Sequence, residues 1–533
     1  MDMSPPLRAT AALLLLLLPF MGVGGAAAAR GEVPKENRLS EEKEENAATA
    51  ADTPASAPKD DTPEPVVTRH AITIDGKPLR YTVTTGLLPI KNAQGEVEAR
   101  VFFLAYNVVE GGRHAAGGKR PLMFSFNGGP GSSSVWLHLG ALGPKRVPMR
   151  GDAGEMPPPP YGLVDNEETW LPYADLVFID PVGTGYSRAA KPDLGKKFWG
   201  VKGDIESIGE FIRLFLSRYE RWDSPLFLVG ESYGTTRASG LAGHLIEKGV
   251  AFNGILLVSS ILNFQTARFD KGNDLPYVLF LPTYAATAFY HKKLPDEYMK
   301  DLEATLKEVE QFAATEYTVA LAQGDTLTEP ERRAVVAKLA RYTGLSEDYI
   351  EQSDLRVEIM RFCKELLRAE RKTVGRLDSR LTGRDALAIS ETPDFDPSMA
   401  AIRPPYTAAF NHYVRTSLGY RTDEPYHILG GGIGSPWEWN AANSYADTSE
   451  ALREAFAKNP YLRLFVASGY YDLATPYFAT EYTLSHMGVP SDLRKNVTTR
   501  EYEAGHMMYI HAPSLSKLRD DVAAFLTDAM KND

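Results

Sequence analysis

A pentapeptide, Gly-Glu-Ser-Tyr-Gly at residues 230–234, constrains the fold of this chain more than any other feature of its sequence. The apolar run 226–229 precedes it, and a stretch compatible with a helix follows it and ends near Glu247. Where a serine between two glycines joins a strand to a helix, the turn is so tight that the hydroxyl stands above the edge of a sheet. The pattern therefore predicts a nucleophilic serine, Ser232, on a strand–turn–helix unit.

Apolar segments elsewhere in the chain follow strand and helix patterns in alternation. Residues 70–74 and 79–83 alternate apolar with polar side chains on either side of the turn 75–78, which predicts an antiparallel hairpin. In 205–219, apolar residues recur at three- and four-residue spacing, which indicates an amphipathic helix. Antiparallel strands followed by alternating strands and helices predict an α/β fold with a central, mostly parallel sheet. Further strands are expected at 101–108, 122–126, 176–179, 226–229, 255–258, 464–466 and 497–502.

The alternation stops between residues 264 and 434, where charged helical stretches dominate. We predict that 264–434 is a helical cap inserted between two parts of an α/β core, 67–263 and 435–533. A cap of this kind is expected to cover the carboxyl ends of the strands, where open α/β sheets bind ligands. A separate helical domain that packs elsewhere is the alternative. Helices are expected at 301–312, 329–342 and 355–371.

The first 29 residues have the pattern of a secretory signal peptide. Arg8 supplies a positive charge, 11–20 form an apolar run with six consecutive leucines, and the small residues 26–29 suit a cleavage site. Glycines end the apolar run well before the roughly 20 residues that a membrane span needs. We therefore expect secretion, with no stable membrane insertion after the signal is removed.

Residues 30–66 contain almost no large apolar side chains and are predicted to be a disordered leader. The chain has one cysteine, Cys363, so it cannot form an intramolecular disulfide. Export without a disulfide framework favours a bacterial protein of the periplasm or the medium.

The composition excludes several classes of protein. Of 533 residues, 44% are hydrophobic and 24% charged, which does not fit collagen-like, coiled-coil or wholly disordered chains. The 58 Lys and Arg residues against 69 Asp and Glu residues give a net charge of −11. Without a dense basic run, the chain lacks the positive surface of a nucleic-acid binder, and no nucleic-acid partner is expected.

A serine nucleophile needs a histidine base and an acid that orients the histidine. After this type of turn the acid precedes the histidine in the chain. His506 follows the expected strand 497–502, and Asp472 follows the expected strand 461–466, so both are predicted to lie at one edge of the sheet. Three competing residues are better explained in other ways. His486 is expected to be a surface or packing histidine within a helix, and His511 to cap or pack the final helix. Asp492 is expected to be an exposed charge.

A glycine-rich segment, 127–134, directly follows the expected strand 122–126. Glycines let backbone N–H groups approach a substrate, and such groups stabilise the oxyanion of acyl transfer. We expect the amides of Gly129 and Tyr233 to form this oxyanion hole. A phosphate-binding loop is the rival interpretation, but the lysine of that pattern is absent. The sequence has no metal-binding spacing of His or Cys residues, so neither metal nor cofactor is expected.

Together, these motifs resemble the serine carboxypeptidase family over most of the chain from about residue 70, outside the insertion. The resemblance implies an α/β-hydrolase fold, a triad of Ser232, Asp472 and His506, the oxyanion hole given above, and release of C-terminal residues from peptides. It also implies that Asn127, the amide of Gly128 and Glu231 hold the terminal carboxylate of the substrate. The motifs that carry it are 127–134, 142–144, Trp170, 180–187, 230–234, Asp472 and 505–507.

Two positions depart from the family pattern. Many members have cysteine at the position of Ser132, and the well-studied carboxypeptidases have glutamate at the position of Ala141. In the family that glutamate pairs with the one before the nucleophile, and two close carboxylates share a proton. A protonated pair can donate to a substrate carboxylate, whereas a lone ionised Glu231 would repel it. Glu231 should also lose one cause of a raised pKa.

These observations predict a secreted, serine-type carboxypeptidase-like hydrolase that acts on peptides. Its carboxypeptidase action is expected to be weaker or more acid-dependent than ester or amide hydrolysis at the same site. An esterase, amidase or acyltransferase with the same triad is the alternative, because Ala141 replaces the glutamate of the carboxylate pair. A non-catalytic binding protein on the same scaffold is the third hypothesis, which the complete triad disfavours.

Overall fold

The computed structural model describes residues 61–110 and 120–531. The predicted signal peptide, 1–29, lies outside the described residues, as does the predicted leader apart from its last residues, 61–66. No helix within the described part of the chain is long and apolar enough to cross a membrane.

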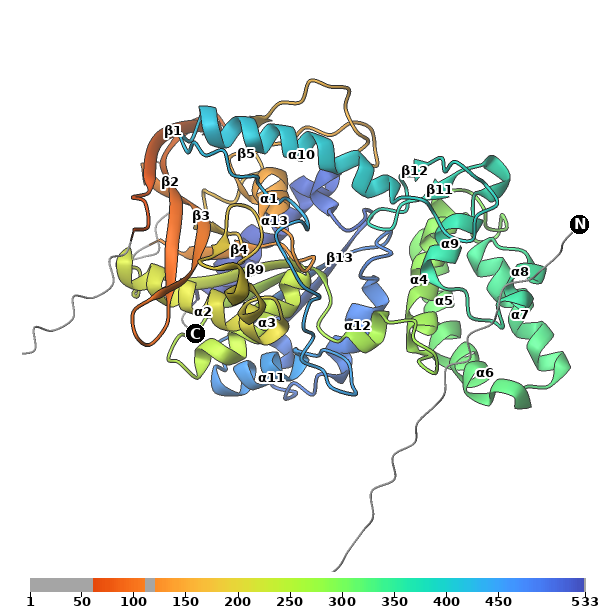
Figure 1. Cartoon of the computed structure of the whole chain (residues 1–533). Coiled ribbons are helices and arrows are strands. Elements are labelled where there is room, and N and C mark those ends of the chain that lie inside the picture. The colour runs from red at the N-terminus through yellow and green to blue at the C-terminus, as the bar shows by residue number, and fades with distance from the viewer. Residues whose placement is uncertain (1–60, 111–119, 532–533) are drawn as a thin grey trace, which may run out of the picture. The chain divides into compact units, whose positions relative to one another are not determined.

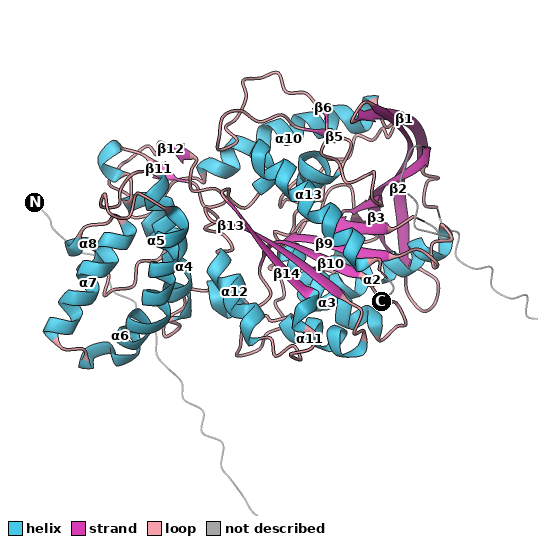
Figure 2. Ribbon diagram, turned by 180° about the vertical axis from the view of Figure 1, so that it is seen from behind, coloured by secondary structure: helices cyan, strands magenta, loops and turns pink. Residues whose placement is uncertain are grey.

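A ten-stranded mixed sheet forms the centre of the fold (Figures 1 and 2). Its strand order is β1-β2-β3-β7-β4-β9-β10-β13-β14, and β8 pairs with β3. The pairs from β1 to β7 are antiparallel, whereas those from β7 to β14 are parallel. The predicted hairpin and the mostly parallel sheet are therefore confirmed. The strands are β1 (Val66–Ile74), β2 (Lys77–Lys91), β3 (Val97–Glu110), β4 (Leu122–Phe126), β7 (Asp175–Ile179), β8 (Arg188–Ala189), β9 (Leu226–Ser232), β10 (Gly254–Ser260), β13 (Arg463–Gly469) and β14 (Val497–Tyr502).

The sheet separates two apolar clusters, because successive side chains of a strand point to opposite faces. In β9, Phe227 and Val229 belong to one cluster and Leu226 and Leu228 to the other. One face is covered by α2 (Val201–Arg218), α3 (Tyr233–Ile246) and α11 (Ser449–Lys458). The other is covered by α1 (Val135–Leu137), the π-helical turn His138–Leu142, α10 (Pro397–Thr416) and α13 (Ala512–Ala529). This three-layer arrangement, with the serine turn after β9, is the α/β-hydrolase fold.

A group of helices between β10 and β13 has an apolar cluster of its own. Figures 1 and 2 show these helices gathered beyond α12 (Tyr477–His486), which contacts α4. Tyr471 and Leu473, which follow β13, also belong to this cluster, so its apolar packing continues into the α/β core. The helices are α4 (Leu275–Tyr290), α5 (Leu302–Phe312), α6 (Thr318–Gln323), α7 (Glu329–Thr343), α8 (Glu347–Gln352) and α9 (Ile359–Glu365).

The helix expected at 355–371 is shorter than the sequence pattern predicts. Asp354 and Leu355 have φ of 49° and 62°, in the left-handed region that a helix cannot include. The helix begins only after Glu358, whose carboxylate accepts from the backbone N–H groups of Met360 and Arg361. It ends at Glu365.

Two short strand pairs complete the secondary structure near the site. β5 (Lys145–Arg146) pairs with β6 (Val164–Asp165), and β11 (Thr373–Val374) pairs with β12 (Thr382–Gly383). The connection between β11 and β12, residues 375–381, lies against the loops that follow β13 and β14.

Candidate active site

The Ser232 turn joins β9 directly to α3. Ser232 has φ 61° and ψ −133°, a strained conformation for a residue other than glycine. A side-chain Cβ at Gly230 would lie 2.2 Å from the carbonyl oxygen of Gly234, and one at Gly234 would lie 2.8 Å from that of Phe126. Both flanking positions therefore need glycine, which explains the pentapeptide that the sequence analysis singled out.

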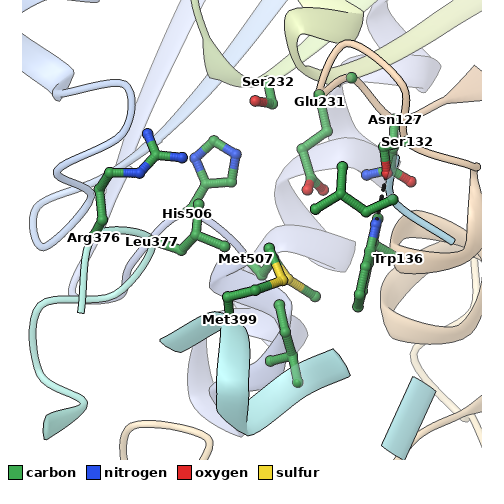
Figure 3. A pocket seen from close by; sticks show the side chains of 14 residues that line it. Asn127, Ser132, Trp136, Glu231, Ser232, Arg376, Leu377, Met399, His506 and Met507 are labelled. Carbon is green, nitrogen blue, oxygen red and sulfur yellow. Dashed lines mark hydrogen bonds between the residues drawn. The ribbon is translucent and has the colours of Figure 1, made fainter. Parts of the chain in front are cut away.

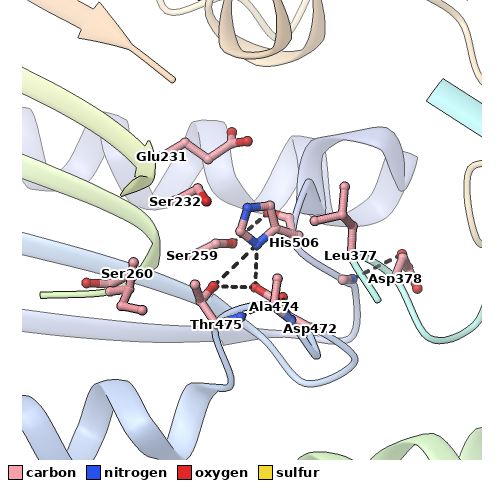
Figure 4. Close-up of polar contacts among 12 residues, drawn as sticks. Glu231, Ser232, Ser259, Ser260, Leu377, Asp378, Asp472, Ala474, Thr475 and His506 are labelled. Atoms are coloured by element: carbon pink, nitrogen blue, oxygen red, sulfur yellow. Dashed lines mark hydrogen bonds and ion pairs between the residues drawn. The ribbon is translucent and has the colours of Figure 1, made fainter. Parts of the chain in front are cut away.

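Asp472 and His506 form a buried hydrogen-bonded pair at the ends of β13 and β14 (Figure 4). Nδ1 of His506 lies 2.8 Å from Oδ2 of Asp472, and the side chains are 5% and 0% exposed. Burial opposes the protonated imidazole, but the charge and hydrogen bond of Asp472, with a contribution from Glu231, raise the pKa of His506. This arrangement suits a histidine that takes up a proton during a reaction.

The Asp472 carboxylate is held by groups from its own loop. The backbone N–H groups of Ala474 and Thr475 donate to Oδ1 over 2.8 and 3.1 Å. The Thr475 hydroxyl donates to Oδ2 over 2.7 Å and also lies 3.3 Å from Nδ1 of His506. These donors fix the carboxylate in the position that orients the imidazole.

Ser232 lies on the opposite side of the imidazole from Asp472. Figure 4 shows the ring nitrogen remote from Asp472 facing the Ser232 side chain. Ser232 and His506 line one pocket, so the structure brings together the three residues of the predicted triad.

The backbone of His506 is fixed by two other segments of the chain. Its N–H donates to the carbonyl oxygen of Leu377 over 2.6 Å, and the Ser259 hydroxyl donates to its carbonyl oxygen over 2.6 Å. A Cβ at Gly505 would lie 2.5 Å from Cβ of Asp378, so only glycine lets the histidine loop approach this closely. Leu377 and Asp378 could not be identified from the sequence, because they lie more than 100 residues before His506 in a segment without a recognisable pattern.

Glu231, next to the nucleophile, is 3% exposed and also lines the pocket. The Tyr509 hydroxyl donates to its Oε2 over 2.6 Å. Burial raises the pKa of Glu231 to about 7, although His506 and the Tyr509 hydrogen bond act in the opposite direction. The family pattern has a glutamate at the position of Ala141. Although this chain lacks that carboxylate, the pKa of Glu231 stays above its ordinary range.

Tyr509 occupies space that a side chain at residue 140 would fill. A Cβ at Gly140 would lie 2.3 Å from the Tyr509 ring, so glycine there admits the ring. Ala141 follows in the same π-helical turn and is fully buried. In this chain, therefore, a phenol hydroxyl rather than a second carboxyl contacts Glu231.

The glycine-rich segment after β4 packs against the first turn of α3. A Cβ at Gly128 would lie 2.4 Å from the backbone nitrogen of Tyr233, and Gly129 has a φ of 101°. Tyr233 is the first residue of α3, and the first N–H groups of a helix have no acceptor within it. This proximity makes the predicted pair of oxyanion donors, Gly129 and Tyr233, geometrically consistent.

Asn127 links this segment to the pocket. Its side-chain oxygen accepts from the backbone N–H of Leu137 over 3.1 Å. Its side-chain nitrogen is buried and has no hydrogen-bond partner among the described residues. Asn127, Gly128, Gly129 and Glu231 all line the pocket with Ser232, so the predicted substrate-binding residues lie at one site.

The rest of the pocket wall is largely apolar (Figure 3). Ser132, at the position where many family members have cysteine, accepts a hydrogen bond from the Trp136 indole over 2.8 Å and so orients that ring. One cation, Arg376, lies beside the apolar side chains. Those apolar side chains are Trp136, Leu377, Met399, Ile402, Leu429 and Met507.

The competing residues of the sequence analysis lie elsewhere. His486 is exposed at the end of α12, where it contacts the carbonyl oxygen of Tyr482 over 2.7 Å. His511 precedes α13 and contacts the Ser514 hydroxyl over 2.7 Å. Asp492 is exposed, and Cys363 is buried within α9.

Comparisons with known proteins show which family the sequence resembles. The sequence profile of the serine carboxypeptidase family matches residues 76–516. Serine carboxypeptidase-like 13 of Arabidopsis thaliana is 30% identical over 204 residues, which are 38% of this chain and 44% of that protein. The pheromone-processing carboxypeptidase KEX1 of Puccinia graminis f. sp. tritici is 30% identical over 141 residues, 26% of this chain and 20% of that protein. The matches thus span less than half the length of these relatives.

Among solved structures, the proline iminopeptidase of Mycobacterium smegmatis is 13% identical with a TM-score of 0.33, covering 84% of this chain and 98% of that one. A thermostable carboxyl esterase from Bacillus coagulans is 12% identical with a TM-score of 0.34, covering 84% of this chain and 99% of that one. Because the family profile covers well over half of the chain, the chain belongs to the serine carboxypeptidase family.

Proposed function

We propose that this protein is a serine carboxypeptidase that releases the C-terminal residue of peptides through an acyl-enzyme on Ser232. One observation carries the proposal: Ser232 and His506, whose ring is paired with Asp472 over 2.8 Å, line one pocket with Glu231, a buried carboxyl group whose pKa is about 7. Ser232 and the Asp472–His506 pair supply an acyl-transfer site. Glu231 supplies a group that can recognise a terminal carboxylate.

In the proposed reaction, His506 removes the proton of Ser232 as its oxygen attacks the last peptide carbonyl. The amides of Gly129 and Tyr233 stabilise the oxyanion of the tetrahedral intermediate. His506 then gives the proton to the leaving amine, and the C-terminal residue departs. Water attacks the remaining ester, its proton passes through His506 to Ser232, and the shortened peptide is released.

Carboxylate recognition is assigned to Asn127, the amide of Gly128 and the protonated form of Glu231. The side-chain nitrogen of Asn127 is buried without a hydrogen bond of ordinary length among the described residues, and it lies near enough to Glu231 to lower the pKa of that group, so it is placed to donate at this wall. With a pKa of about 7, Glu231 carries a proton at mildly acidic pH and can donate it to the substrate carboxylate. Above that pH it ionises and repels the substrate. Peptide release is therefore expected to favour acidic conditions.

Ester or amide hydrolysis and acyl transfer form the second candidate, because they proceed through the same acyl-enzyme. The observation that favours these reactions is the alanine at position 141. Because Ala141 has no carboxyl group, Glu231 is contacted by the Tyr509 hydroxyl and not by a second carboxyl group. Product analysis with an added alcohol or amine acceptor distinguishes transfer from hydrolysis. A binding protein without activity, the third hypothesis, requires that a fluorophosphonate probe fail to label the chain.

We also propose that residues 1–29 direct secretion, into the periplasm or medium of a bacterium, and that residues 264–434 act as a cap. The contact between Leu377 and the backbone of His506 supports the second proposal, because it places part of this segment beside the pocket. Within the same segment, residues of α10 belong to an apolar cluster of the α/β core.

The test is a digest of a peptide library by the purified protein beside a Ser232→Ala variant. We expect loss of single C-terminal residues with the wild type and none with the variant. Cleavage within the peptides, or equal efficiency at neutral pH on free-acid and C-terminally amidated peptides, would contradict the proposal. The same experiment reports the residue preference on both sides of the cleaved bond.

A further inference from the structure

Arg376 is a half-buried cation that lines the reactive pocket. Within the described residues, its guanidinium group has no hydrogen bond or ion pair. Arg380, four residues later in the same connection, is different: it pairs with Asp378 over 2.7 Å and donates to the carbonyl oxygens of Asp152 and Glu503. One arginine of this connection is therefore structural, and the other is available to a ligand.

The backbone of Arg376 is fixed on both sides. Its N–H donates to a carboxylate oxygen of Asp396 over 3.1 Å, and its carbonyl oxygen accepts from the N–H of Leu473 over 3.0 Å. The next residue, Leu377, accepts from the N–H of His506. Figure 3 shows the Arg376 side chain beside the His506 ring, on the side away from Glu231. The backbone of Arg376 is thus held in a set position relative to the catalytic histidine, and the side chain extends from it along the pocket wall.

We propose that Arg376 binds the side-chain carboxylate of an acidic C-terminal residue, best a glutamate. This inference rests on the proposed function. His506 protonates the leaving amine, so the leaving residue must lie beside the histidine loop. Asn127 and Glu231 occupy the wall assigned to its main-chain carboxylate. The side chain of the leaving residue then lies against the opposite wall of the pocket, which includes Arg376.

That other wall suits a glutamate in two respects. Leu377, Met399 and Met507 offer apolar surface for the methylene groups of the side chain. The guanidinium group of Arg376 offers paired donors that match a carboxylate in geometry as well as charge.

The local charge makes such a cation necessary for an acidic substrate. The chain carries a net charge of −11, and the Asp472 carboxylate lies behind His506 at the site itself. These charges disfavour a peptide that ends in two carboxylates. An unpaired arginine inside the pocket offsets that repulsion, and a partner in the substrate relieves the cost of keeping the cation half-buried.

The experiment compares kcat/KM for three peptides that differ only at the C-terminus, ending in Glu, in Gln or in Glu amide, at pH 6. The variants are Arg376→Met, Arg376→Lys and, as a control for the change in net charge, Arg333→Met on the exposed surface of α7. Thermal unfolding of each variant checks that it is folded.

We expect the wild type to prefer Glu over Gln by roughly tenfold or more, the range for one charge-assisted contact. In Arg376→Met the ratio of kcat/KM for the Glu peptide to that for the Gln peptide should fall to about one, and Arg376→Lys should restore part of it. Arg333→Met should keep the wild-type ratio. No wild-type preference for Glu, or an equal loss on the Glu and Gln peptides in Arg376→Met, would overturn the inference. The second result would mean that Arg376 acts on both peptides alike, through the terminal carboxylate or through its charge beside His506.

A second measurement separates this inference from the proposed function. If the wild type hydrolyses none of the peptides, the carboxypeptidase proposal fails. Binding of the Glu and Gln peptides to Ser232→Ala then tests Arg376 alone. Tighter binding of the Glu peptide that disappears in Ser232→Ala/Arg376→Met supports the anion site, and equal binding of both peptides contradicts it.

Discussion

Tyr509 donates a 2.6 Å hydrogen bond to Glu231, the residue that precedes the nucleophile. The family pattern has two carboxylates that share a proton in this region, and this chain has one carboxyl group and a phenol. Burial still raises the pKa of Glu231 to about 7, so a proton remains available under mildly acidic conditions. A carboxyl group can thus keep the same protonation state through desolvation instead of through a like-charged neighbour.

The first prediction concerns the pH dependence of carboxylate recognition. In the wild type, the ratio of kcat/KM for a free-acid peptide to that for its amide should fall as pH rises through about 7, because Glu231 loses its proton there. In Glu231→Gln the side chain stays neutral and keeps a donor, so the ratio should change little between pH 5 and pH 9. A parallel fall in the variant would mean that another group controls recognition.

The second prediction concerns Tyr509. Its hydroxyl donates to the ionised form of Glu231 and so lowers the pKa of that group. In Tyr509→Phe this stabilisation is lost, and the fall in the free-acid to amide ratio should move to higher pH by about one unit. Ester hydrolysis serves as the control, since no carboxylate is bound. A shift to lower pH, or no shift, would contradict the role given to this hydrogen bond.

The third prediction concerns the positioning of the triad. Thr475→Val removes the hydroxyl that donates to Asp472 but keeps a side chain of similar volume. We expect kcat to fall roughly tenfold on esters and peptides alike, the effect of about 1.4 kcal/mol in the barrier. KM should change little, because Thr475 does not line the pocket. An unchanged kcat would show that the two backbone donors alone hold the carboxylate.

The fourth prediction concerns the tight turn. Gly230→Ala places a Cβ where the carbonyl oxygen of Gly234 lies 2.2 Å away, so the turn must open. We expect a loss of at least about 2 kcal/mol in the free energy of unfolding, together with loss of activity. Gly162→Ala is the matched control, since a Cβ at Gly162 meets no atom within 4 Å. Urea denaturation of both variants provides the comparison, and equal stability would contradict the steric argument.

The sequence predicted the α/β core well, because its strands are short apolar runs with clear ends. The bounds of β4 and β14 agree with the expected 122–126 and 497–502. β2 extends to Lys91, beyond the expected 79–83, since it pairs along that length with β3. Pairing between strands is a property of the folded chain and leaves no local pattern.

The candidate site was predictable where a residue follows a strand and less so elsewhere. Ser232, Asp472 and His506 could be selected by chain order and position after strands. Thr475 could have been suspected, because a threonine three residues after an acid often donates back to it. Leu377 and Arg376 come from a segment without a recognisable pattern, and their place beside His506 depends on tertiary packing.

The central claim is that the Asp472–His506 pair activates Ser232. The most direct test is to treat the protein with a fluorophosphonate and map the adduct by mass spectrometry, in the wild type and in His506→Gln. The account predicts one adduct in the wild type, on Ser232, and none in the variant over the same time. An adduct on a different residue, or labelling of Ser232 that proceeds equally fast without the imidazole, would contradict it.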